Sequence, residues 1–282
     1  MSCRLLSLIR AGRILLVFAL FAQLLSTATA FTNGQPASLV LGQPDFTSKA
    51  LATTASGMNY PTDLAVDPTS GKVFVADHYN HRVLRFASSA ALTSGIAAEG
   101  VLGQPDFTSY ALIIPPNARG MSAPTGVAVD TAGRLWVADY NNSRVLRFDS
   151  AAGAPLALPA DGVLGQPDFT SYASTTTAST MHNPTGVAVD SAGRLWVADE
   201  GNSRVLRFDG ASGKPNGAPA DGVLGQPDFT SRTQATTASG MNLPTGVAVD
   251  IDGYLWVVDY FNNRVLRFDS AIPMVYLPLI TR

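Results

Sequence analysis

Aspartate recurs at two fixed positions of this sequence, and a carboxylate can bind a metal ion or act as an acid or base. One set closes the pattern Ala-Val-Asp, and the other closes Val-Ala-Asp or Val-Val-Asp. The members are Asp67, Asp130, Asp190 and Asp250 in the first set, and Asp77, Asp139, Asp199 and Asp259 in the second. A ring of these oxygens around an axis could hold Ca²⁺ or another divalent metal. Aspartate also closes turns with its own side chain, and because every unit has it, we favour turn formation.

An arginine follows each aspartate of the second set by five residues. These arginines are Arg82, Arg144, Arg204 and Arg264. The planar guanidinium group suits a carboxylate, either across a hairpin or between neighbouring units. Because every unit carries this pair, we expect it to be structural, whereas a binding site usually breaks the symmetry of a repeat.

The loop after the second aspartate differs between the units, and it is the candidate binding surface. The candidate residues are His78, Tyr79, Tyr140, Asn141, Glu200, Tyr260 and Phe261. Their aromatic rings offer stacking area, and the amide and carboxylate groups offer hydrogen bonds. Exposed aromatic residues at loop tips suit sugars or peptides. Packing of these rings against neighbouring loops is the alternative, and the sequence leaves it open.

Catalytic signatures are sparse. Histidine occurs at His78, His81 and His182 only, and although the first two could share a metal, no third histidine is placed with them. We therefore favour surface histidines. No Gly-x-Ser-x-Gly motif and no glycine-rich phosphate loop occurs. The sequence predicts no catalytic residue and no required cofactor.

The first 30 residues have the pattern of a secretory signal peptide. Three arginines precede an apolar run over residues 14–21, and the segment ends Ala28-Thr29-Ala30. This predicts cleavage near Ala30 and a protein that is secreted or held at the cell surface. A membrane anchor is the alternative, but no charged stop-transfer segment follows, so no span is expected in the mature protein.

Charge and cysteine content exclude several classes of function. The formal net charge is −2, and loss of the three arginines gives −2 − 3 = −5. No basic run follows Arg13, which argues against nucleic acid and anionic membranes as partners. The one cysteine, Cys3, lies in the predicted signal peptide, so the mature chain would have no disulfide and no cysteine metal site.

The chain repeats itself with a period of about 60 residues. The string Val-Leu-Gly-Gln-Pro-Asp-Phe-Thr-Ser begins at Val40, Val101, Val163 and Val223. Short segments rich in Val, Leu, Phe and Trp lie between turn residues and predict four β-strands per unit. Gly-Val-Ala-Val-Asp would be the innermost strand, because its small residues fit a crowded axis. The nine-residue string would be the outermost strand, where an edge tolerates proline.

Residues 124–149, 184–209 and 244–269 resemble NHL repeats, and residues 61–86 match less well, with Asp63 in place of glycine. The resemblance implies β-propeller blades. We therefore predict an all-β protein with a signal peptide (1–30), a propeller of four-stranded NHL-type blades (31–270) and an apolar tail (271–282). The last unit stops after Arg-Val-Leu-Arg-Phe-Asp, so we expect four blades, closed by the N-terminal strand completing the last one.

The resemblance implies diverse functions, including protein and RNA binding, carbohydrate-associated surface roles and catalysis, so it does not select an activity. We favour a secreted, non-enzymatic propeller that binds a protein, peptide or carbohydrate ligand through its loop face. One alternative is a metal-dependent lyase or lactonase that uses axial carboxylates with His78. Another is a structural module that assembles with copies of itself, and the oligomeric state is left open.

Overall fold

A computed structural model describes residues 31–153 and 156–269. The predicted signal peptide and the predicted tail lie outside these residues. The chain divides into two units, Met1–Ser38 and Leu39–Arg282, and every strand belongs to the second. In the part of the chain that is described, no helix has the length and apolar character needed to span a bilayer.

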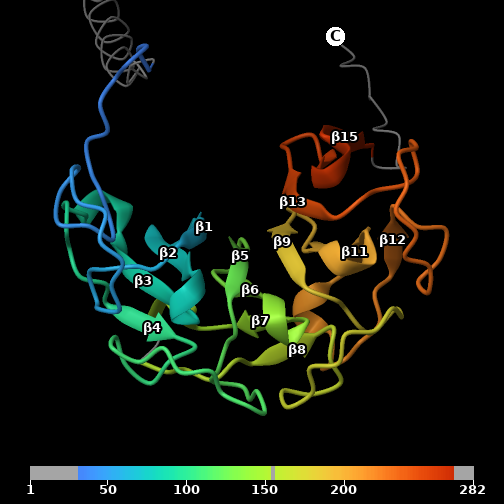
Figure 1. Ribbon diagram of the computed structural model, residues 1–282, viewed down its shortest axis with the longest axis horizontal. Coiled ribbons are helices and arrows are strands. Elements are labelled where there is room, and N and C mark those ends of the chain that lie inside the picture. Colours follow the sequence, from blue (N-terminus) through green and yellow to red (C-terminus); the bar gives the residue numbers. More distant parts are fainter. Residues whose placement is uncertain (1–30, 154–155, 270–282) are drawn as a thin grey trace, which may run out of the picture. The chain divides into compact units, whose positions relative to one another are not determined.

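Each repeat folds into one antiparallel sheet, and we number these sheets blades 1 to 4 in chain order (Figure 1). Blade 1 contains β1 (Pro61–Val66), β2 (Lys72–Asp77), β3 (Arg82–Ser88) and β4 (Gly100–Leu102). Blade 2 contains β5 (Pro124–Val129), β6 (Leu135–Asp139), β7 (Arg144–Phe148) and β8 (Gly162–Leu164). Blade 3 contains β9 (Pro184–Val189), β10 (Leu195–Asp199), β11 (Arg204–Phe208) and β12 (Gly222–Leu224). Blade 4 contains β13 (Pro244–Val249), β14 (Leu255–Asp259) and β15 (Arg264–Phe268).

The all-β fold and the arrangement in blades are confirmed. Strands are ordered in each sheet as they occur in the chain, so Gly-Val-Ala-Val-Asp is innermost and the nine-residue string is outermost. Inner strands of successive blades pack on one another, β1 on β5, β5 on β9 and β9 on β13. Blade 4 has three strands within the described residues, where the prediction was four.

Apolar side chains fill the space between neighbouring blades. Phe74 of blade 1 packs in one cluster with Val137 and Phe148 of blade 2. Trp136 of blade 2 packs in the same way with Val197 of blade 3. Both faces of a middle sheet are therefore covered by other sheets, which explains why its strands are apolar on both sides.

The outer strand is shorter than predicted. It covers only Gly-Val-Leu, because the glycine that follows, such as Gly103 with φ of 90°, has left-handed backbone that ends the extended strand. The proline thus follows the strand and does not lie within it. The aspartate that follows the proline closes a turn. Hydrogen bonds from the side chain and backbone of the threonine two residues later lower the pKa of Asp45, Asp168 and Asp228 to about 2.

The predicted closure by the N-terminal strand is wrong for this structure. Leu41 packs against the blade 1 cluster of Val73, Leu84 and Phe86, whereas Leu266 belongs to the cluster around blade 4. Within the described residues β15 pairs with β14 only. Three junctions join the inner strands, β1 with β5, β5 with β9 and β9 with β13, and no comparable junction joins β13 to β1 among the described residues.

Candidate ligand-binding site at the start of the inner strands

Each hairpin between the second and third strands is built in the same way. The second strand ends in a buried aspartate, a 3-10 turn follows, and a residue with left-handed backbone then leads into the third strand. The turns are η1 (His78–Asn80), η3 (Tyr140–Asn142), η5 (Glu200–Asn202) and η7 (Tyr260–Asn262). Since Asp77 pairs with Pro61, the hairpins lie at the end of the blades where the inner strands begin.

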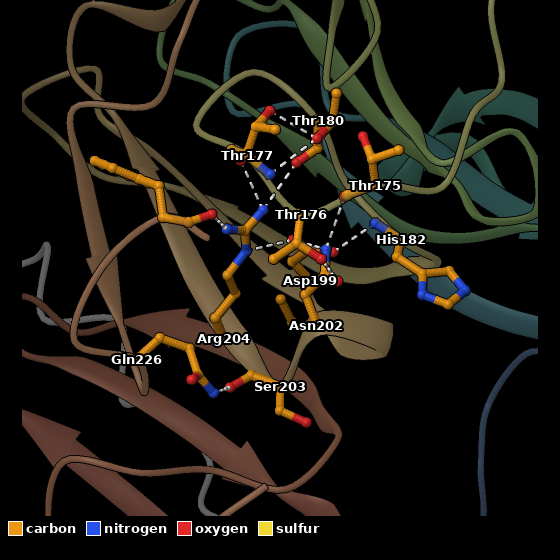
Figure 2. Close-up of polar contacts among 12 residues, drawn as sticks. Thr175, Thr176, Thr177, Thr180, His182, Asp199, Asn202, Ser203, Arg204 and Gln226 are labelled. Atoms are coloured by element: carbon orange, nitrogen blue, oxygen red, sulfur yellow. Dashed lines mark hydrogen bonds and ion pairs between the residues drawn. The ribbon is translucent and has the colours of Figure 1, made fainter. Parts of the chain in front are cut away.

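Figure 2 shows how the second aspartate set is used in blade 3. Asp199 accepts hydrogen bonds from the backbone N–H of His182 at 2.7 Å, from Asn202 at 2.9 Å and from Nε of Arg204 at 2.7 Å. Arg204 Nη2 donates to the carbonyls of Thr177 and Thr180, both at 2.9 Å. The aspartate and arginine thus fasten the long loop to the hairpin.

The same ion pair occurs in all four blades, which confirms the predicted structural role. The first aspartate set closes the turns at the other end of the blade. Asp190, for example, accepts bonds from the backbone of Ala192 and Arg194 and from Nε1 of Trp196. Neither set lines the axial cavity described next, so neither forms the carboxylate ring that the sequence suggested.

A cavity of about 350 Å³ lies where the inner strands of all four blades begin. Its lining comprises Thr62, Asp63, Thr125, Gly126, Thr185, Gly186, Val187, Thr245, Gly246 and Val247. Threonine hydroxyls link successive blades here. Thr62 donates to the carbonyl of Thr125 at 2.8 Å, and Thr125 donates to the carbonyl of Thr185 at 3.1 Å. These hydroxyls therefore serve the blade junctions.

Asp63 is the one carboxylate of this cavity lining, and sequence reasoning missed it as a site residue. It accepts the backbone N–H of Leu64 at 2.8 Å and that of Val127, in blade 2, at 2.9 Å. Burial raises the pKa of Asp63 above its ordinary value, although these two bonds act in the opposite direction. The signal in the sequence was the replacement of a repeated glycine.

Five of the seven predicted binding residues fall into two groups. Tyr140 and Glu200 are half-buried, and burial together with the negative charge of Glu200 raises the pKa of Tyr140. Burial also raises the pKa of Glu200. Tyr79, Tyr260 and Phe261 are more than half exposed at the hairpin tips.

The remaining two predicted residues make local contacts. Nδ1 of His78 lies 3.1 Å from the carbonyl of Pro124, and Asn141 donates to the Ser122 hydroxyl at 3.2 Å. Tyr79 meets the rings of Tyr60 and His78 edge to face, so packing between loops accompanies exposure. None of the seven residues lines the axial cavity.

The histidines do not assemble a metal site. Nδ1 of His81 accepts the backbone N–H of Ala123 at 3.0 Å, and burial together with the charge of His78 lowers the pKa of His81. In residues 31–153 and 156–269, no three side chains of His, Cys, Asp or Glu are grouped so that they could hold a metal ion.

Asp63→Asn is expected to raise the melting temperature at pH 7 by a small amount, on the order of a few degrees. A carboxyl group whose pKa is raised by folding adds stability below its unfolded pKa and loses that contribution as the pH rises through the folded pKa. The amide carries no charge and can still accept the Val127 N–H. Thermal unfolding from pH 3 to pH 8 should show the gain at neutral pH and its loss in acid.

Asp106→Asn is the control with the opposite sign. Bonds from the side chain and backbone of Thr108 lower the pKa of Asp106, so its contribution is present at neutral pH and is lost in acid. This variant should therefore melt below the wild type at pH 7. The same pH profile for both variants would contradict the raised pKa of Asp63.

Family comparison gives a match to the NHL repeat at residues 58–86, 121–148 and 181–208, which fall in blades 1, 2 and 3. A stretch of 94 residues is 32% identical to a probable peptidyl-alpha-hydroxyglycine alpha-amidating lyase of Caenorhabditis elegans. That match covers 33% of this chain and 24% of the lyase, so this chain spans about a quarter of its length.

One solved structure has a similar fold at low identity, and a second is more distant. A protein of unknown function from Bacteroides thetaiotaomicron gives a TM-score of 0.51 at 16% identity, over 74% of this chain and 47% of that one. Virginiamycin B lyase of Staphylococcus aureus gives a TM-score of 0.41 at 17% identity, over 78% of this chain and 57% of the lyase. The first likeness supports the fold alone, and the second is too distant to carry an argument.

Proposed function

This chain is an NHL-repeat protein, and from that premise we propose that it binds a peptide or glycan at the hairpin end of its blades. The observation that carries the proposal is where the repeat loses its symmetry. Core residues and ion pairs recur in every blade, whereas the position after the buried aspartate is His78, Tyr140, Glu200 or Tyr260 in turn. Asp63 breaks the repeat at the same end.

The chemistry of these groups suits a ligand with hydroxyl or ammonium groups and an apolar face. Asp63 and Glu200 are acidic, and burial raises the pKa of each, so a donor that pairs with either one relieves an unfavourable charge. Tyr79, Tyr260 and Phe261 provide exposed rings for stacking on a sugar or on a peptide side chain. The proposed location is outside the cell, following the predicted signal peptide.

Tyr140→Ala combined with Tyr260→Ala is expected to leave the fold intact and to weaken ligand binding at least tenfold. The reason is the loss of stacking area at two hairpins. A panel of glycans and of amine-bearing peptides would be screened first, and calorimetry would then compare the variants. Tyr172→Ala is the matched control, because Tyr172 is similarly exposed but lies in a long loop. Equal loss in the control, or binding unaffected in the double variant, would refute the proposal.

The lyase relative gives a specific reason to keep a metal-dependent enzyme as the second candidate. Asp63 would then be the cavity residue able to contribute to a Ca²⁺ or other divalent site, completed by substrate or water. Metal analysis of the purified protein separates the two candidates. A stoichiometric metal whose removal by a chelator lowers the melting temperature would favour the enzyme, and a metal-free protein indifferent to the chelator would discard it.

A further inference from the structure

We propose that the open faces of blade 4 and blade 1 bind a second copy of this chain, head to tail. In this assembly the string Val40–Phe46 of one copy becomes the outer strand of blade 4 in the other. The inference is independent of the ligand proposed above.

Blade 4 exposes a face that the other blades bury. Trp256 and Val258 are each 40% exposed and Val265 is 60% exposed. The equivalent residues of blade 2 include Trp136, at 1%, and Val145, at 0%, which are covered by blade 3. The open face therefore has the shape and apolar character of a blade junction without the next blade.

Blade 1 carries the other half of such a junction. Leu41 covers the outer part of its open face as Leu102 covers blade 2, and the Val40 carbonyl accepts the Gly95 N–H at 3.1 Å. The string thus lies on blade 1 in the way that the outer strand of one blade lies on the blade that follows it. Leu64 on the inner part of this face remains 60% exposed, whereas its equivalent Val127 is 4% exposed.

Hydrogen-bonding groups on the two faces match as well. In blades 1 to 3 the arginine of the hairpin donates through Nη1 to the phenylalanine carbonyl of the string that completes its own blade. The pairs are Arg82 with Phe107, Arg144 with Phe169, and Arg204 with Phe229, each at 2.5 Å. Within the described residues Arg264 has no such carbonyl, and its side chain is 26% exposed where Arg82, Arg144 and Arg204 are at 0%. Phe46 of the second copy would supply it.

The string glutamine gives a second, independent match. It donates to the carbonyl of the left-handed hairpin residue, as Gln166 does to Ser143 and Gln226 does to Ser203, both at 2.9 Å. Within the described part of the chain, Gln43 bonds only to the Ala50 carbonyl at 2.9 Å. The counterpart hairpin residue in blade 4 is Asn263. In the proposed assembly Gln43 of one copy would donate to the carbonyl of Asn263 in the other. The contact would repeat a junction that each chain already forms three times.

The contact joins different surfaces of the two copies, so it closes with two copies or continues to a longer assembly. Light scattering after size exclusion should give the mass of at least two chains. Val265→Glu should reduce this to the monomer mass without changing the circular dichroism spectrum. Ile251→Glu is the control, because Ile251 is fully exposed in a turn and should leave the mass unchanged. A monomeric wild type at high micromolar concentration would overturn the proposal.

Register gives a sharper test. Val205 pairs with Leu224 in blade 3, so Val265 should pair with Leu41 of the second copy. One chain carrying Leu41→Cys and another carrying Val265→Cys, both with Cys3→Ser, should form a disulfide-linked heterodimer on oxidation. Ile251→Cys in place of Val265→Cys should not.

Two results would assign the open edge to a different occupant. A chain with both Leu41→Cys and Val265→Cys that forms its disulfide at the monomer mass would show that the ring closes within one chain. Association that appears only after removal of residues 270–282 would show that this segment covers β15. Either result would overturn the proposal.

Discussion

Arg204→Ala is expected to lower the free energy of unfolding by about 3–5 kcal/mol, since it leaves a buried carboxylate without its partner. Asp199 and Arg204 are both fully buried, and Nε lies 2.7 Å from the carboxylate. The substitution also removes two bonds to the loop at Thr177 and Thr180 (Figure 2). For a domain of this size the melting temperature should fall by about 6–20 °C. Thermal and urea unfolding followed by circular dichroism measure both quantities.

Arg264→Ala is the matched control for this prediction. Arg264 makes the same pair with Asp259, but its side chain is 26% exposed. In a single chain, water can therefore solvate the aspartate that remains, and the loss should be clearly smaller at a protein concentration where copies do not associate. Hydrogen exchange should in addition show Arg204→Ala opening the loop over residues 175–180. Equal losses in the two variants would mean that burial of the pair does not determine its contribution.

Gly126→Ala is expected to destabilise the protein by about 3 kcal/mol or more, because the blades approach too closely for a side chain. A Cβ atom at Gly126 would lie 2.2 Å from the carbonyl oxygen of Thr185 and 3.1 Å from the Cα atom of Gly186. Both atoms are backbone of the next inner strand, so relief requires the two blades to separate. Urea unfolding of the variant would measure the loss.

Gly246→Ala tests whether the blade junction is the cause. Gly246 occupies the same position in blade 4, but the nearest atom to a Cβ there is Cγ2 of Val258 at 3.1 Å. We expect a change within about 1 kcal/mol, since alanine also costs less conformational entropy than glycine. The comparison belongs at low protein concentration, where copies do not associate. A large loss at Gly246 would point to the strand itself and not to the junction.

Much of the fold could be predicted, because the repeat displays its requirements four times. Small residues at the axis, the Asp199–Arg204 pair and the apolar faces recur, and each repeated feature proved structural. The extent of the outer strand was not predictable from composition. It ends where Gly103 takes left-handed backbone, and glycine alone does not reveal which conformation it adopts.

Ring closure and the site depended on features that a repeat pattern does not carry. The angle between one blade and the next depends on how side chains such as Trp136 fill the junction. The number of strands in a repeat does not give that angle. Asp63 could be noticed as an exception to a repeated glycine, but its bond from the Val127 N–H depends on the neighbouring blade. The hairpin residues were predicted as a set, and in the structure burial and the charge of Glu200 raise the pKa of Tyr140.

In blades 1 to 3 the outer strand pairs with its own blade and also packs against another blade or its open face. Leu102 is hydrogen-bonded into blade 1 through β3, while its side chain lies in the cluster shared with blade 2. When a blade unfolds, its outer strand therefore no longer covers the next blade. We expect the sheets to unfold one after another along the chain. A single chain should begin to unravel at blade 4, whose outer face nothing among the described residues covers. Proteases would then release fragments shortened by whole repeats, with cuts near the loops that separate them.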